Sequence, residues 1–301
     1  MNESIRMVVF GDSVPWGQGH WEKDKYRRKV ERALGASAVN YSHSGATIGV
    51  GDQTVEAPCN GEVPVTHPTI LKQCERFNDD PASVRIILVN GGINDVNIRV
   101  IMFPLTTSEY LSRQIRRYCH DDMCNLLYQI AAKFSHPDAT IILTGYYPIV
   151  SPESDPFAVE KYLNALCITI PIFMDRGLVL NRVVENSMQF WHESTRCLKA
   201  AVDEVNQNSP GQPRIRFINV PFQPKNSMYA SDPWLFELNK DLILSPQDPV
   251  AEIRAPFCNE CFKYDLVARE QCYRASAGHP NLLGSDEFAK AILHTVRTAS
   301  V

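Results

Sequence analysis

Five short apolar runs recur along the chain, and stretches with helical spacing separate them. The run at 84–90 is the clearest, because it is almost continuously apolar, as in a strand buried on both faces. The expected strands are 5–10, 38–41, 84–90, 140–144 and 214–220. Strands that alternate with helices are typical of a parallel sheet covered by helices on both faces. The sequence therefore predicts an α/β fold.

Apolar residues at helical spacing occupy most of the segments between these runs. Helices are expected at 25–34, 66–77, 107–131, 157–173, 180–206 and 285–298. Residues 221–278 differ, because they contain many Pro, Asp and Cys residues and show little periodicity. We interpret them as a loop-rich insertion within a single domain that spans residues 1–301. The insertion, together with 150–176, is a candidate lid.

Composition excludes several functional classes for this 301-residue chain. The net charge is −4 and neither sign forms a long run, which argues against nucleic acid or an anionic membrane as the main partner. No stretch approaches the ~20 apolar residues of a membrane span. The first residues lead directly into the first expected strand and leave no room for a signal peptide. A cytoplasmic location is the resulting expectation.

Nine cysteines are scattered along the chain. An odd number without a signal peptide favours mostly reduced thiols. Cys258, Cys261 and Cys272, with His279 beyond them, have a spacing that superficially matches zinc ligands. His279 is better placed for another role, so no metal is expected. A disulfide among these three cysteines and structural zinc remain alternatives to free thiols.

Small or polar residues follow the first three expected strands. Ser13 ends the turn Gly11-Asp12-Ser13, Gly45 lies in the loop after the second strand, and Asn94 follows the third. Ligands of open parallel sheets bind beyond the carboxyl ends of the strands, so these loops are expected at one rim. Ester cleavage needs such a grouping: a nucleophile, and donors for the oxyanion that its attack creates. The alternative is a strand-to-helix turn in which Asp12 and Ser13 are only caps.

A general base is also required, and His279 is the candidate. It lies in Gly278-His279-Pro280, just before the last expected helix. Pro280 restricts the backbone after the histidine. The structural alternative is a solvated loop histidine.

Four segments in this order resemble the motif blocks of the SGNH/GDSL hydrolase family. They are Gly11-Asp12-Ser13, Gly45, Gly92-x-Asn94-Asp95 and His279-Pro280. The resemblance covers nearly the whole chain. It implies a flavodoxin-like three-layer α/β/α sandwich with a five-stranded parallel sheet. It also implies hydrolysis of carboxylic esters or related acyl bonds without a metal or cofactor.

The resemblance also implies a role for each matching residue. Ser13 would be the nucleophile and His279 the general base. The oxyanion hole would consist of Ser13, Gly45 and Asn94. Asp12 and Asp95 would brace their turns and take no part as the catalytic acid.

One position departs from the family pattern. The family usually has an aspartate three residues before the histidine, and here that position is Ser276. A main-chain carbonyl or the Ser276 hydroxyl would then accept from Nδ1 of His279, which gives a dyad. Alternatively, an acid of the insertion, such as Asp265, would reach the imidazole. We favour the dyad.

The resulting hypothesis is an esterase/lipase-like serine hydrolase that forms an acyl-enzyme intermediate. Its partner would be a small-molecule ester or acylated substrate. One alternative is an acyltransferase that uses the same residues. Another is a non-catalytic binding protein of the same fold. The sequence does not specify the oligomeric state.

Overall fold

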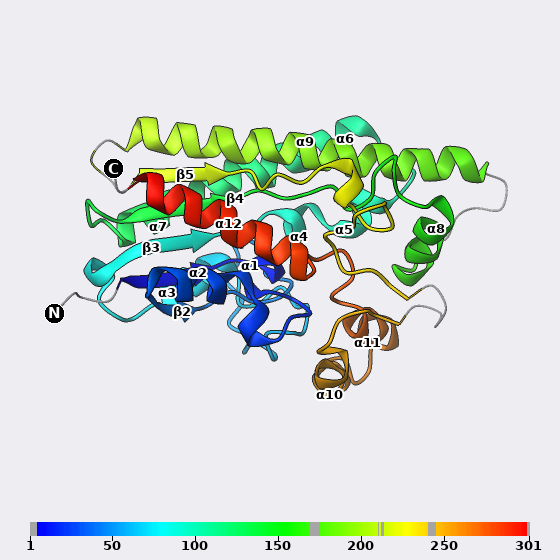
Figure 1. Cartoon of the computed structure of the whole chain (residues 1–301), viewed down its shortest axis with the longest axis horizontal. Helices are drawn as coiled ribbons and strands as arrows, with labels where there is room; N and C mark the ends of the chain where they lie inside the picture. The colour runs from blue at the N-terminus through cyan, green and yellow to red at the C-terminus, as the bar shows by residue number, and fades with distance from the viewer. Residues whose placement is uncertain (1–4, 169–174, 210, 212–213, 240–244, 300–301) are drawn as a thin grey trace.

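The computed structural model describes residues 5–168, 175–209, 211, 214–239 and 245–299. A single parallel sheet of five strands forms its centre, in the order β2-β1-β3-β4-β5 (Figure 1). The strands are β1 (Arg6–Phe10), β2 (Ser37–Asn40), β3 (Val84–Val89), β4 (Thr140–Thr144) and β5 (Arg214–Ile218). This is the flavodoxin-like strand order. The predicted fold class and all five expected strands are confirmed.

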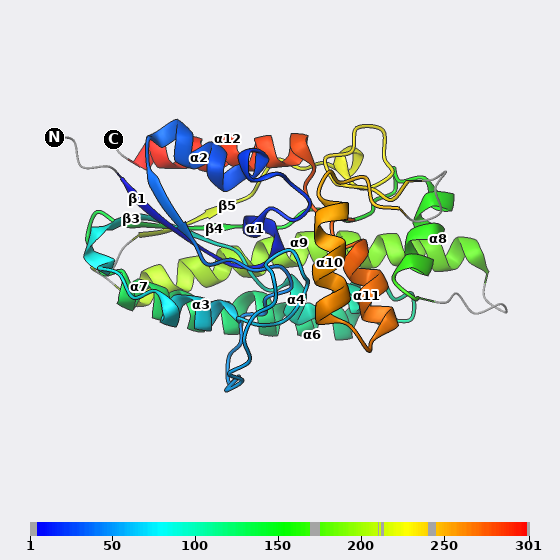
Figure 2. The ribbon, with the colours of Figure 1, turned by 90° about the horizontal axis from the view of Figure 1, so that it is seen from below.

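Helices cover both faces of the sheet, as Figure 2 shows. One face carries α2 (Tyr26–Leu34) and α12 (Leu282–Ala299), which pack against each other. The helices on the opposite face are α3 (Ile70–Arg76), α6 (Ser108–Arg116), α7 (Met123–Lys133) and α9 (Arg176–Asn208). The central strands are therefore enclosed on both sides, which explains why their sequences are nearly all apolar.

Several helix boundaries differ from the expected ones. α3 begins at Ile70 rather than near 66, because Thr69 caps it: the Thr69 hydroxyl accepts from the Lys72 N–H. The expected helix 107–131 is divided, since a π-helical stretch (η3, Arg117–Asp122) joins α6 to α7. The expected helix 157–173 appears as α8 (Pro156–Ala165), and 169–173 lie outside the described residues.

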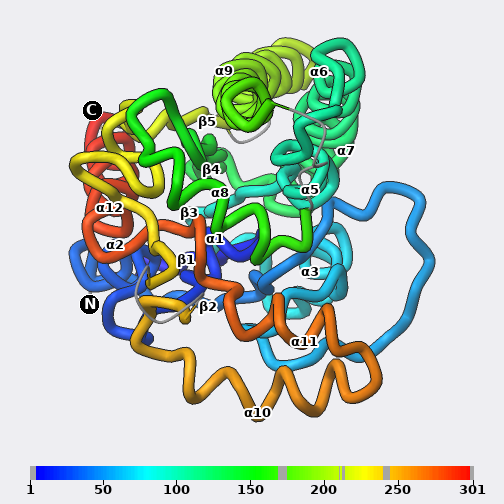
Figure 3. Tube along the Cα trace, turned by 90° about the vertical axis from the view of Figure 1, so that its right-hand side faces the viewer, coloured from blue at the N-terminus to red at the C-terminus, as the bar shows by residue number. Residues whose placement is uncertain are grey.

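The predicted insertion, 221–278, contains two helices that its weak periodicity did not predict. They are α10 (Ala251–Cys261) and α11 (Leu266–Tyr273), and they lie side by side beyond the carboxyl ends of the strands (Figures 1 and 3). The short elements of the fold are α1 (Ser13–Trp16), α4 (Ile93–Val96), α5 (Ile98–Met102), η1 (Glu22–Asp24), η2 (Pro81–Ser83) and η4 (Pro224–Asn226). Within the described ranges, no helix has both the length and the apolar character needed to cross a membrane.

Two disulfides attach the insertion to itself and to the loop after β2. Cys258 bonds to Cys272 and so joins α10 to α11, whereas Cys261 bonds to Cys59. The expectation of mostly reduced thiols is wrong for these four residues, because partners 14 and 202 residues apart are brought together only by the tertiary fold. The free cysteines are Cys74, Cys119, Cys124, Cys167 and Cys197. Disulfide sulfurs are not thiolates, so the zinc alternative at 258–272 is also contradicted.

Candidate active site

Ser13 and His279 meet at the carboxyl end of the sheet. Ser13 is the first residue of α1, directly beyond β1, and His279 lies in the segment that leads into α12. The Ser13 hydroxyl oxygen and His279 Nε2 are 2.6 Å apart, although 266 residues separate them in the chain. The fold therefore brings together the two residues that the sequence suggested as nucleophile and base.

Asp12 holds the turn that carries Ser13. One carboxylate oxygen accepts from the Val14 N–H at 2.8 Å and thereby caps α1. The other accepts from the Tyr146 hydroxyl at 2.8 Å, and that hydroxyl also accepts from the Ile93 N–H at 3.1 Å. Burial raises the pKa of Asp12 to about 6. As expected, Asp12 braces its turn.

Tyr146 is a residue of this region whose polar role sequence reasoning missed. It follows β4, and its hydroxyl links the loop after β1 to the loop after β3. From the sequence, Tyr146-Tyr147-Pro148 is expected to pack, with the lining of an acyl pocket as the alternative, and neither reading includes a hydrogen-bonding role. Its hydrogen bonds are formed with residues more than 50 positions away, so no local pattern signals them.

The three suggested oxyanion-hole residues line the same cavity as His279. Ser13 begins α1, so its N–H is one of the first-turn donors without an intrahelical acceptor. Gly45 has φ of +78°, and a Cβ placed there would lie 2.5 Å from the backbone nitrogen of Val65. No other residue type fits that position without moving the loop.

Asn94 is oriented by the loop that carries Gly45. Its Nδ2 donates to the Ala46 carbonyl at 3.0 Å, and an amide nitrogen has a second hydrogen for another acceptor. The neighbouring Asp95 accepts from the Ile48 N–H at 3.1 Å and braces the same loop. Burial raises the pKa of Asp95 to about 7. The loops after β2 and β3 are thus fixed to each other.

His279 is held by a main-chain carbonyl. The Ser276 carbonyl accepts from the His279 backbone N–H at 2.9 Å, in a turn whose third residue, Gly278, has φ of +81°. The same carbonyl lies 3.3 Å from His279 Nδ1. If Nδ1 carries the ring proton, Nε2 is free to accept from Ser13. Burial lowers the pKa of His279 to about 4, which keeps the imidazole neutral at pH 7.

Asp265, the acid considered as a remote third member, does not reach His279. Its carboxylate caps α11 and accepts from the Ala268 N–H at 2.9 Å. Of the two arrangements left open by Ser276, the structure has the one in which a backbone carbonyl faces Nδ1.

The cavity that the four predicted residues line has a volume of about 420 Å³. Ser13, Gly45, Asn94 and His279 supply its polar groups near the reacting centre. Apolar side chains form much of the remaining wall, among them Ile93, Ile98, Tyr147, Ile149, Leu166 and Leu238. The insertion contributes Phe262 and Ala268 to the wall of the cavity.

Comparisons with known proteins find likeness in structure and none in sequence. No family model matches the chain, and no curated protein matches it by sequence. A carbohydrate esterase family 2 enzyme with a carbohydrate binding domain from Corynascus thermopiles (Myceliophthora fergusii) is 16% identical, with a TM-score of 0.47. The match covers 98% of this chain and 66% of that one.

Two further solved structures show a similar degree of likeness. A carbohydrate acetylesterase from Sinorhizobium meliloti is 12% identical, with a TM-score of 0.46, and the match covers 98% of this chain and 99% of that one. A salicylyl-acyltransferase from a tetracycline biosynthetic pathway is 11% identical, with a TM-score of 0.45 and coverage of 100% and 56%. At these identities the likeness is one of backbone arrangement.

Proposed function

We propose that this chain is a serine hydrolase of the SGNH/GDSL type that cleaves carboxylic esters. The observation that carries the proposal is the 2.6 Å contact between Ser13 Oγ and His279 Nε2, at a cavity that Gly45 and Asn94 also line. The four motif blocks of the sequence thus come together in space. This arrangement supports Ser13 as nucleophile, His279 as base, and Ser13, Gly45 and Asn94 as the oxyanion hole.

The first half-reaction forms an acyl-enzyme. His279 Nε2 takes the hydroxyl proton of Ser13 while the serine oxygen attacks the ester carbonyl carbon. The carbonyl oxygen becomes negatively charged, and the N–H groups of Ser13, Gly45 and Asn94 donate to it. The tetrahedral intermediate then expels the alkoxide, which leaves as the alcohol after it receives the proton from His279.

The second half-reaction releases the acid. Water attacks the acyl carbon of Ser13 and gives its proton to His279, and the same donors bind the new oxyanion. Collapse of this intermediate breaks the bond to the serine oxygen, which recovers its proton from His279. Each proton and charge is handled by groups of the chain itself, so the proposal needs no metal or cofactor.

The shape and lining of the cavity support a small-molecule ester with an apolar acyl or alcohol portion. Burial of apolar substrate surface against the cavity wall supplies binding free energy. The Ser13–His279 contact argues against a protein that only binds. Acyl transfer to an alcohol in place of water uses the same first half-reaction, and an added acceptor distinguishes the two outcomes.

The two disulfides bear on where such a hydrolase would work. Disulfides persist in oxidising compartments and are rare in the cytosol. They therefore weigh against the cytoplasmic location expected from the sequence, and we propose an oxidising compartment.

Labelling with a fluorophosphonate probe, followed by mapping of the modified residue, tests the proposed function. We expect modification of Ser13 in the wild-type protein and none in Ser13→Ala. Ser44→Ala is the matched control, because Ser44 lines the same cavity next to Gly45, and this variant should still be labelled. No labelling of the folded wild-type protein, or labelling at another serine, would contradict the proposal.

A further inference from the structure

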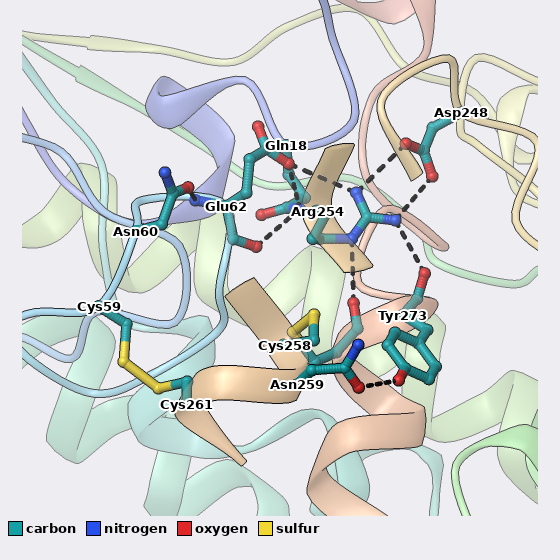
Figure 4. Close-up of a disulfide and its surroundings, with 11 residues drawn as sticks. Gln18, Cys59, Asn60, Glu62, Asp248, Arg254, Cys258, Asn259, Cys261 and Tyr273 are labelled. Atoms are coloured by element: carbon teal, nitrogen blue, oxygen red, sulfur yellow. Dashed lines mark hydrogen bonds and ion pairs between the residues drawn. A yellow bond between two sulfur atoms is a disulfide. The ribbon is translucent and has the colours of Figure 1, made fainter. Parts of the chain in front are cut away.

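A fully buried ion pair lies behind the turn that carries His279. Arg254 of α10 and Asp248 both have side chains with 0% exposure. Arg254 Nη2 is 2.9 Å from Asp248 Oδ2, and Nη1 is 3.2 Å from Oδ1, so the pair is bidentate (Figure 4). Such a pair costs desolvation free energy, which favours a role beyond simple stabilisation.

The guanidinium of Arg254 has five N–H donors, and each has an acceptor. Two donate to Asp248, and Nη1 donates to Glu62 at 3.4 Å. Nε donates to the Cys272 carbonyl at 3.0 Å, and Nη2 donates to the Tyr273 carbonyl at 2.8 Å. Figure 4 shows how Arg254 connects these groups. The ion pair is thereby fixed to the backbone three to four residues before Ser276.

Asp248 in turn binds Ser276, whose hydroxyl donates to Asp248 Oδ2. Ser276 is fully buried. Its carbonyl faces Nδ1 of His279 and accepts from the His279 backbone N–H. The backbone of the preceding residue, Ala275, also hydrogen-bonds the imidazole. A continuous series of contacts therefore leads from Arg254 through Asp248 and Ser276 to the imidazole.

We infer that Asp248, held by Arg254, is a positioning residue for His279: it anchors Ser276 and so fixes the carbonyl that orients the imidazole. The inference rests on the proposed hydrolase function. Asp248 contacts neither the imidazole nor a substrate atom, and Arg254 balances its charge. Its part is geometric, because reacting groups displaced by about 1 Å lose up to about 10²-fold in rate.

The contacts of Asp248 also account for the departure from the family pattern at position 276. A side-chain carboxylate there would face the imidazole directly. In this chain the carboxylate lies one hydrogen bond further away, at Asp248, and the main chain of Ser276 makes the contact. Arg254 pairs with both Asp248 and Glu62, so a carboxylate at 276 would be the third acid around one arginine in a buried site.

Ser276→Ala is the primary test, because it removes the hydroxyl and leaves the ion pair intact. We expect kcat to fall by about 10- to 100-fold with KM within about twofold, since misplacement of the base affects the chemical step. Asp265→Asn is the matched control, because Asp265 is an exposed acid of the same insertion. An asparagine there can still cap α11, so kcat should not change. Asp248→Asn is less suitable, because it would leave Arg254 buried with only the 3.4 Å contact to Glu62 as an ion pair and so disturb the arginine as well as Ser276.

A spectroscopic measurement separates positioning from a purely structural role. ¹⁵N–¹H spectra of the imidazoles should show His279 with its proton on Nδ1 in the wild type and a mixture of tautomers in Ser276→Ala. The exchange variant Asp248→Ser/Ser276→Asp keeps one carboxylate, one hydroxyl and the Arg254 partner. Ser276→Asp alone should lower kcat, because the new carboxylate and Asp248 repel each other. The exchange variant should recover much of that loss.

The outcomes distinguish the two proposals. If the wild type is folded but neither labelled at Ser13 nor active on esters, the hydrolase function itself fails. If the wild type is active and Ser276→Ala keeps its kcat and its His279 tautomer, the positioning role is overturned and the hydrolase remains. A lower melting temperature with unchanged kcat and tautomer also overturns the positioning role.

Discussion

His279 presents one ring nitrogen to the hydroxyl of Ser13 and the other to the carbonyl oxygen of Ser276. A carbonyl dipole can fix the orientation of the imidazole, but it stabilises the imidazolium less than a carboxylate would. In a triad with an aspartate, loss of that charge lowers kcat by about 10⁴. The proposed dyad therefore depends strongly on geometry.

Ser13→Ala should leave the fold intact and abolish turnover of short p-nitrophenyl esters, because no other group replaces the attacking oxygen. Steady-state hydrolysis measures the turnover, and a thermal melt followed by circular dichroism checks that the variant is folded. Ser44→Ala should retain the wild-type rate to within a few-fold. Substantial turnover by Ser13→Ala would show that the nucleophile is elsewhere.

Asn94→Ala should lower kcat by about 10²–10³, the effect of removing one oxyanion-hole donor. KM should change little, since the donor acts on charge that develops in the transition state. Saturation kinetics with one ester separates the two constants. An effect confined to KM would make Asn94 a ground-state binding residue.

The pH dependence should reflect the lowered pKa of His279. Because its folded pKa is about 4, kcat/KM should stay high between pH 5 and 6, where an ordinary imidazole of pKa 6.5 becomes protonated. The pH profile of kcat/KM tests this directly. An acidic limb centred near pH 6.5 would show that His279 is more hydrated than its surroundings in the fold indicate.

The same pKa values predict opposing contributions to stability. At His279 the unfolded chain binds more protons between about pH 4 and 6.5, so its stabilising contribution is full above pH 6.5 and is lost as the pH falls toward 4. Asp12 and Asp95 have raised values of about 6 and 7. The stabilising contributions of Asp12 and Asp95 are fully present below pH 3.8 and are lost as the pH rises through 6 to 7. Thermal melts of His279→Ala over a range of pH should lose only the pH dependence that is due to His279.

Removal of the Cys258–Cys272 disulfide by a double substitution to alanine should lower the free energy of unfolding by about 2–4 kcal/mol. α10 and α11 should loosen first, and with them Arg254. Denaturant unfolding measures the change. Cys167→Ala is the control, because Cys167 is free and exposed, and it should match the wild type. An unchanged unfolding midpoint for the double variant would indicate that packing alone holds the two helices.

The sequence predicted the sheet because buried strands have a local signature. Each central strand is enclosed by helices, so its residues are apolar at nearly every position, as in β3. The topology then places the loops after β1, β2 and β3 at one rim of the sheet. For this reason the sequence alone predicts that Ser13, Gly45 and Asn94 lie close together.

The supporting contacts have no such signature. Asp248 and Arg254 pair across a turn, and Ser276 joins them from 28 residues beyond Asp248, at spacings that no repeating pattern produces. α10 and α11 bury few residues, so the apolar periodicity that marks a core helix is weak in them. Tyr146 was missed for the same reason, because its partners come from two other loops.

The disulfide between Cys59 and Cys261 divides the chain into a covalent ring and two open tails. β3, β4 and β5 belong to the ring, whereas β1 and β2 are in the first tail and α12 is in the second. Ser13 lies 46 residues before Cys59. From Cys261 the route returns three residues to Cys258, crosses the second disulfide to Cys272 and runs seven residues to His279. About 56 residues therefore separate Ser13 and His279 by the shortest covalent route, compared with 266 along the backbone. Loop-closure entropy grows with the logarithm of length, and this shortcut lowers the cost of their encounter by about 1 kcal/mol. Backbone cleavage at one point of the ring would leave Ser13 and His279 in one covalent molecule.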